Sequence, residues 1–168
     1  MTKEHLRFQP SDGTRMAALT GAPLASFTRR AIAFCIDFMA AFLTFLLVLF
    51  LAARLGAKLH LIDPGANINL RFSFGNWYSL IWLVGYFTLS VYLMNGRTLG
   101  KIICRIRIVS LTHEHITLWH AFERALGYGA SALEAGFGFF QYFIRPDRRT
   151  VHDRIAETIV LSEQAKKK

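Results

Sequence analysis

One apolar stretch in the sequence is too long to be an ordinary core element of a small soluble domain. Residues 31–53 form 23 consecutive positions in which Asp37 is the single charged residue. A helix of this length rises about 35 Å, which is enough to cross a hydrocarbon layer roughly 30 Å thick. Arg29 and Arg30 precede the stretch, where arginines favour the headgroup region. We therefore expect residues 31–53 to span a membrane.

The composition agrees with a membrane protein and excludes several other classes. The 168 residues are 53% hydrophobic, and 20 Lys and Arg against 11 Asp and Glu give a formal charge of +9. So small a soluble globule cannot bury that much apolar surface. A disordered basic chain would lack the apolar excess, and two cysteines cannot hold a disulfide scaffold together. We expect no nucleic-acid partner, because the basic residues lie at the edges of apolar segments.

Two further apolar stretches follow. Residues 77–94 contain no charge and carry aromatic residues at their edges, which is typical of a second membrane span. Residues 118–144 are interrupted by charges, including Glu134, and by four glycines. This pattern favours a third helix that is amphipathic or re-entrant, with a full third crossing as the less favoured alternative.

The basic residues predict the side of the membrane on which each segment lies. There are five before residue 31, three in 54–76, five in 95–124 and seven in 145–168. The positive-inside rule therefore places both termini in the cytoplasm, which requires an even number of crossings. We expect a multi-pass protein of the bacterial inner membrane, whose first span is an uncleaved signal anchor. The basic tail should be attracted to anionic lipid headgroups.

The cytoplasmic segments contain strand-like patterns. Residues 105–109 alternate arginines with β-branched residues, and residues 158–161 are a second β-prone run that is predicted to pair with them. Just before the second run, Thr150 and Asp153 have the spacing of a helix capping box.

The fold class expected from these patterns is an all-α membrane protein. It has two transmembrane helices, a third amphipathic or re-entrant helix over about 118–144, and a small cytoplasmic β element. The domain organisation that we predict is a cytoplasmic tail over 1–26, a membrane domain over 27–162 and a basic tail over 163–168.

Asp37 is the first candidate for chemistry. A carboxylate at the centre of a span costs roughly 2.5–3.5 kcal/mol, so it requires a partner or a function. The seven-residue spacing places Arg30, Asp37 and Thr44 on one helix face. Asp37 is either a proton- or cation-binding carboxylate, or half of a buried ion pair that fixes helix docking. We favour the ion pair, with Arg30 or an arginine of residues 97–107 as the partner.

Other polar residues are weaker candidates. Glu134 is either a second intramembrane acid or, as we favour, part of the polar face of an interfacial helix. Asp153 is expected to pair with a cytoplasmic arginine such as Arg30, and also to act as a first-turn helix carboxylate. The histidines at 113, 115 and 120 invite a metal site, but they lie at a predicted turn without cysteine, so we expect no metal and no cofactor. Because no phosphate loop, nucleophilic triad or catalytic carboxylate pair is present, we expect no enzyme activity.

Taken in order, several short motifs resemble the RDD family of small bacterial membrane proteins. They are Arg29-Arg30 with Asp37, the run 96–101, the alternating run 105–109 and the run 149–160. The likeness covers about residues 24–162. The family takes its name from one arginine and two aspartates, which the resemblance places at Arg30, Asp37 and Asp153, with Arg29 as an alternative to Arg30. Where many members carry an aspartate in the third helix, this chain has Glu134.

The resemblance implies two kinds of function. Transport of small ligands and cation/proton exchange have been suggested for members, and others are thought to be membrane partners of larger systems. We expect a non-catalytic membrane adaptor or accessory subunit that packs against other membrane proteins. The alternative is a transporter of a cation or small ligand through Asp37, which requires a homo-oligomer because two spans cannot enclose a pathway. Residues 77–94 offer few polar groups for a conduit, which favours the adaptor.

Overall fold

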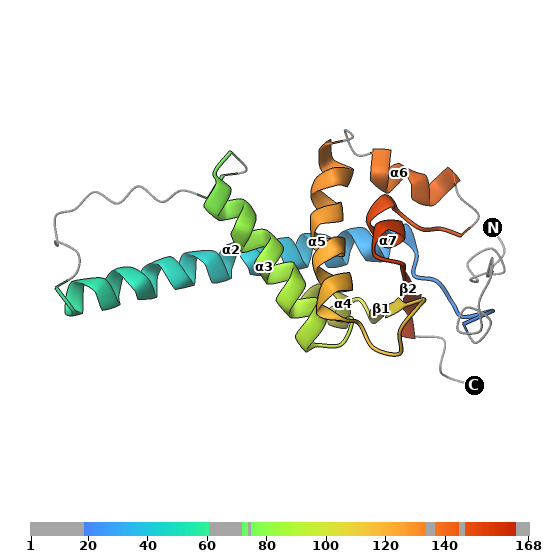
Figure 1. Ribbon diagram of the computed structural model, residues 1–168, viewed down its shortest axis with the longest axis horizontal. Coiled ribbons are helices and arrows are strands. Elements are labelled where there is room, and N and C mark those ends of the chain that lie inside the picture. Colours follow the sequence, from blue (N-terminus) through green and yellow to red (C-terminus); the bar gives the residue numbers. More distant parts are fainter. Residues whose placement is uncertain (1–18, 61–71, 74, 134–136, 145–146, 164–168) are drawn as a thin grey trace.

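The computed structural model describes residues 19–60, 72–73, 75–133, 137–144 and 147–163. It is mostly helical, with one long apolar helix and a short two-stranded sheet (Figure 1). In chain order the elements are α2 (Phe27–Lys58), α3 (Trp77–Leu93), α4 (Leu99–Ile103), β1 (Ile106–Ser110), α5 (Leu118–Leu133), α6 (Phe137–Ile144), α7 (Val151–Ile155) and β2 (Thr158–Ser162).

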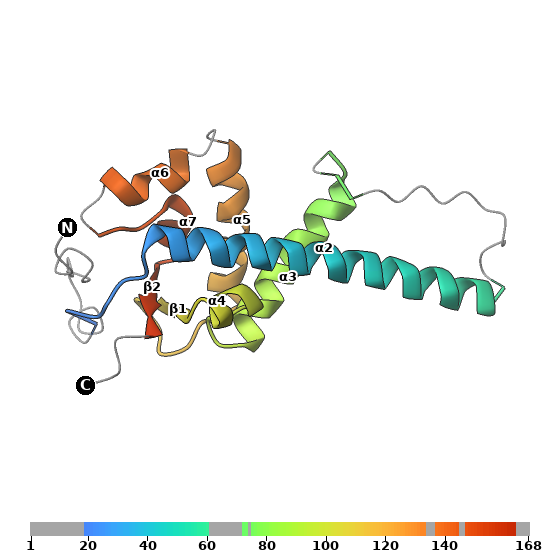
Figure 2. The same cartoon turned by 180° about the vertical axis from the view of Figure 1, so that it is seen from behind.

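Helix α2 lies along the longest axis of the structure and contains the span predicted at 31–53. Its 32 residues rise about 48 Å. The buried residues Ala33, Asp37, Ala41 and Phe45 recur every fourth position and form one stripe. Figure 2 shows the other helices gathered around the first half of α2, while its second half extends away from them. Among the described residues, α2 is the one helix that is long and apolar enough to cross a membrane.

Helix α3 coincides with the second predicted span, but it is short for a crossing. Its 17 residues are apolar and rise about 25 Å. It contacts α2 through Trp82, whose Nε1 donates to the carbonyl of Ala41 at 2.9 Å and whose ring lies against Phe45. Helix α3 is therefore an apolar helix packed beside the long apolar helix α2.

The turn after α3 joins the helix to the sheet. Asn95 and Gly96 have φ angles of 47° and 85°, in the left-handed region that favours these two residue types. The carbonyl of Gly96 accepts a hydrogen bond of 2.8 Å from the N–H of Ile108. A Cβ atom at position 96 would lie 2.1 Å from the carbonyl oxygen of Ile108. This close approach requires glycine, and it fixes where the segment 97–101 begins.

The predicted strand pairing is confirmed. Strands β1 and β2 are antiparallel, with Ile108 opposite Val160. The alternation in β1 is also confirmed, since Ile106 and Ile108 are buried in the same core as Val91. The segment before α2 lies along β2, because the N–H of Ala25 donates to the carbonyl of Val160 at 2.9 Å.

The single third helix expected over 118–144 is a pair of helices in the structure. Helix α5 covers 118–133 and α6 covers 137–144; Gly136 lies between them and Gly138 lies in the first turn of α6, and glycine has low helix propensity. Thr117 caps α5, because its Oγ1 accepts a hydrogen bond from the N–H of His120 at 3.2 Å. Glu134 lies outside the described residues.

Candidate functional site

The first candidate site is centred on Asp37, which is fully buried in α2. The hydroxyl of Thr98 donates to Oδ2 of Asp37, and the N–H of Gly100 donates to Oδ1 at 2.7 Å. The Nζ of Lys101 lies 3.2 Å from Oδ2. Both oxygens of this carboxylate are thus bonded to groups of the same chain.

The short helix α4 delivers all three partners of Asp37. Thr98 is its N-cap, and the Thr98 Oγ1 accepts a hydrogen bond of 3.1 Å from the Nζ of Lys101. A Cβ atom at Gly100 would lie 2.1 Å from the carbonyl oxygen of Ala33 and 3.0 Å from Cγ of Asp37. Glycine at position 100 therefore lets the backbone of α4 lie directly on α2, where its N–H reaches the carboxylate.

This geometry corrects the partner expected for Asp37. The ion pair is with Lys101, not with Arg30 or with an arginine of residues 97–107. The third residue of the predicted helix face, Thr44, donates its hydroxyl to the carbonyls of Ala40 and Ala41 in its own helix. Residues that share this helix face by spacing thus have different partners, because Asp37 is bonded to α4 whereas Thr44 is bonded within α2.

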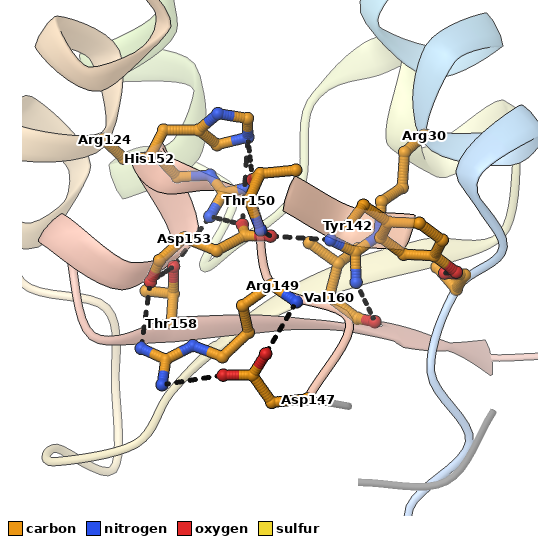
Figure 3. A network of polar contacts seen from close by, with 11 residues as sticks. Arg30, Arg124, Tyr142, Asp147, Arg149, Thr150, His152, Asp153, Thr158 and Val160 are labelled. Atoms are coloured by element: carbon orange, nitrogen blue, oxygen red, sulfur yellow. Dashed lines mark hydrogen bonds and ion pairs between the residues drawn. The ribbon is translucent and has the colours of Figure 1, made fainter. Parts of the chain in front are cut away.

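The second candidate site is centred on Asp153 in α7, which is also fully buried. Arg30 and Arg124 approach its carboxylate from opposite sides (Figure 3). Nη1 of Arg30 lies 2.6 Å from Oδ2, and Nη1 of Arg124 donates to Oδ1. The N–H of Thr150 donates to Oδ2 at 3.2 Å, which is the backbone bond of the predicted capping box. Asp153 therefore has both predicted roles: it pairs with Arg30, and it is the carboxylate in the first turn of α7.

The two arginines connect Asp153 to the rest of the fold. Arg124 donates to the hydroxyl of Thr158 at 2.7 Å, and Arg30 donates to the carbonyl of Val160 at 3.3 Å. The guanidinium of Arg30 also lies 5.0 Å from the centre of the Tyr142 ring. One carboxylate thus joins α2, α5, α7 and β2.

The surroundings of Asp153 and His152 determine the charge state of each side chain. Burial by itself would raise the pKa of Asp153, but the neighbouring Arg124 and Arg30 outweigh it and hold the pKa below its usual range. Burial lowers the pKa of His152 to about 3, so its imidazole is neutral at pH 7. Two arginines around one carboxylate then leave one excess positive charge.

The remaining candidate residues lie elsewhere. Arg29 donates to the hydroxyl of Ser162 at 3.0 Å, so it does not replace Arg30 at Asp153. Within the part of the chain that the structure describes, no three His, Cys, Asp or Glu side chains are grouped so as to hold a metal ion. Lys101 and Arg124 were not singled out as site residues from the sequence. The available signal for Arg124 was a positive charge within the largely apolar stretch 118–144.

Comparison with known proteins gives one match. The model of the RDD family matches residues 24–157, which include both buried carboxylates and all of their charged partners. No curated protein and no solved structure matches the chain.

Proposed function

The chain belongs to the RDD family of membrane proteins, and from this premise we propose that it is a non-catalytic adaptor or accessory subunit that packs against other membrane proteins. The observation that carries the proposal is the bonding of Asp37. Its two oxygens are occupied by Thr98, Gly100 and Lys101, so the one acid of the long apolar helix is used to hold α4 in place. A carboxylate with these partners is better suited to stabilising the contact between α2 and α4 than to binding and releasing ions.

The apolar surface of α2 supports the same proposal. In its second half, Leu47, Phe50 and Leu51 are each more than half exposed. Such a surface needs lipid or another apolar helix around it. We propose that α2 and α3 both cross the bacterial inner membrane, with the sheet, α7 and both termini on the cytoplasmic side, as the distribution of basic residues indicates.

The proposal assigns no catalytic activity to the chain. Both buried carboxylates are paired with cations and hydrogen-bonded, which leaves neither available as a general acid or base.

An oligomeric transporter is the second candidate, and one observation favours it. Lys101 contacts Asp37 and also lines a cavity of about 360 Å³ next to α2. The cavity gives a small ligand a route toward this ion pair. Transport would require a homo-oligomer, because two spans do not enclose a pathway.

A flux measurement separates the two functions. Purified protein is reconstituted in liposomes with an imposed pH gradient, and Na⁺, K⁺ or Li⁺ is added. The adaptor predicts that folded wild-type protein dissipates the gradient no faster than empty liposomes do. Cation-dependent flux that Asp37→Asn abolishes and Thr44→Val retains would contradict the adaptor and establish Asp37 as a transport residue. Thr44→Val is the matched control because the Thr44 hydroxyl bonds only carbonyls of its own helix.

A second measurement tests the adaptor directly. A photoreactive amino acid at Phe50, which is 61% exposed, is activated in intact cells. We expect a reproducible protein adduct with another integral membrane protein. The control position is Ile155. It is an exposed apolar residue of α7 and lies away from the exposed surface of α2. Adducts with lipid alone at Phe50 would contradict a stable protein partner on this surface.

A further inference from the structure

One cavity is lined by residues of both buried carboxylate sites. Its volume is about 360 Å³, and side chains of α2, α4, α5, α6 and α7 line it. Phe34, Tyr128 and Phe139, from three different helices, form what we call the aromatic wall. The ring centroid of Phe34 lies 5.2 Å from that of Tyr128 and 6.2 Å from that of Phe139. The interior is therefore mainly apolar.

Three cations also line this cavity, and we call Arg30, Lys101 and Arg124 the cationic trio. Two carboxylates neutralise part of their charge, since Asp37 pairs with Lys101 and Asp153 pairs with both arginines. Three positive charges against two negative ones leave one excess positive charge among the described residues of this region. An excess charge in an apolar enclosure is costly unless an anion approaches it.

The position of the cavity indicates where an anion would come from. Cys35 lines the cavity and is also exposed on the surface of α2, so the cavity reaches the flank of the membrane helix. Arg30, near the start of α2, lies at the level expected for lipid headgroups. A volume of about 360 Å³ is at the lower end of ligand pockets, which span roughly 300–1,000 Å³. It suits a single apolar chain and is small for a complete two-chain lipid.

We propose that this cavity binds one anionic lipid, with its phosphate head beside the cationic trio and part of one acyl chain against the aromatic wall. The excess positive charge selects an anionic head over a zwitterionic one. The aromatic wall selects a lipid over a free anion, because an inorganic ion would leave the apolar surface uncovered. This binding does not rest on the adaptor role, and a lipid held here would occupy the space that the transporter alternative assigns to its ligand.

The test counts lipids that stay bound to the protein. Full-length protein is reconstituted in vesicles of phosphatidylcholine and phosphatidylglycerol at a 4:1 ratio, extracted in mild detergent and analysed by native mass spectrometry. We expect one phosphatidylglycerol per chain, at least tenfold enriched over phosphatidylcholine relative to the vesicle composition. An excess of inorganic phosphate should not displace it, whereas oleate should compete.

A matched pair of variants locates the bound lipid. Cys35→Trp fills the cavity from its exposed edge and removes no charged group, so it should reduce lipid retention at least tenfold. Met39→Trp adds the same side chain one turn further along α2, at a position that is 56% exposed and does not line the cavity, and should bind like the wild type. Equal retention of the two lipids by the wild type, displacement by phosphate, or unchanged retention in Cys35→Trp would each overturn the proposal.

Discussion

Asp153 bonds to more partners than the sequence patterns predicted. Its carboxylate receives Arg30, Arg124 and the N–H of Thr150, and all three come from different places in the fold. The buried guanidinium of Arg124 and the partly buried guanidinium of Arg30 both depend on it for charge compensation. Removing one partner of a buried ion pair costs more than the pair itself contributes, because the other partner stays buried and charged.

We therefore predict that Asp153→Asn lowers the free energy of unfolding by about 3–5 kcal/mol. The measurement is chemical unfolding in detergent, followed by circular dichroism. Asp147→Asn is the control, because the Asp147 carboxylate pairs with Arg149 at 4.0 Å and both groups are partly exposed. It should cost about 1 kcal/mol or less. Equal losses in the two variants would mean that the Asp153 centre contributes no more than a surface ion pair.

His152 makes stability depend on pH. Burial, with Arg124 and Arg30 adding to it, lowers the folded-state pKa to about 3, against an ordinary value of 6.5. The unfolded chain therefore takes up a proton near pH 6.5, and the folded protein does not. This contribution to stability is fully present above pH 6.5 and is lost as the pH falls toward 3.

Between pH 6.5 and 4.5 the wild type should thus lose about 1.4 kcal/mol per pH unit. Unfolding free energies measured across this window give the slope. His152→Gln should flatten the slope, whereas His113→Gln, at an exposed position, should leave it unchanged. A slope that persists in His152→Gln would assign the pH dependence to another group.

At the scale of elements, the contact between α4 and α2 depends on the absence of a side chain at position 100. We predict that Gly100→Ala destabilises the protein by about 1–3 kcal/mol, because its Cβ would lie 2.1 Å from the backbone oxygen of Ala33. The matched control is Gly85→Ala in α3, where no atom lies within 4 Å of the added Cβ. That change should be neutral or stabilise the helix by about 0.5–1 kcal/mol. Thermal unfolding of both variants checks the prediction, and a fully stable Gly100→Ala would show that α4 can move away from α2.

The elements that local patterns specify were predictable, and those that depend on distant partners were not. The β1–β2 pairing follows from period-two alternation and β-branched residues, and α2 follows from its apolar length. The partner of Asp37 is 64 positions away, and Arg124 is 29 positions from Asp153. Spacing along one helix face suggested Arg30 as the ion-pair partner of Asp37. Which element packs on that face is decided by tertiary contacts, such as the close approach of α4 to α2 at Gly100.

At the scale of the whole molecule, the first half of α2 is held from two directions. Helix α4 holds Asp37 from one sequence region, and α7 with β2 holds Arg30 from another. The second half of α2 has a different environment, because Figure 1 shows it extending beyond the other helices. The molecule is thus a packed unit at one end of a long apolar helix, which is the shape expected if other membrane components cover the rest.

The separation of Arg30 from Asp153 also has a consequence during synthesis. The two residues are 123 positions apart. At a translation rate of 5–20 residues per second, roughly 6–25 s pass between the addition of the arginine and the addition of its carboxylate. Helix α2 therefore leaves the ribosome well before α7 and β2 exist, and the packed end of the protein closes only as the last quarter of the sequence is made.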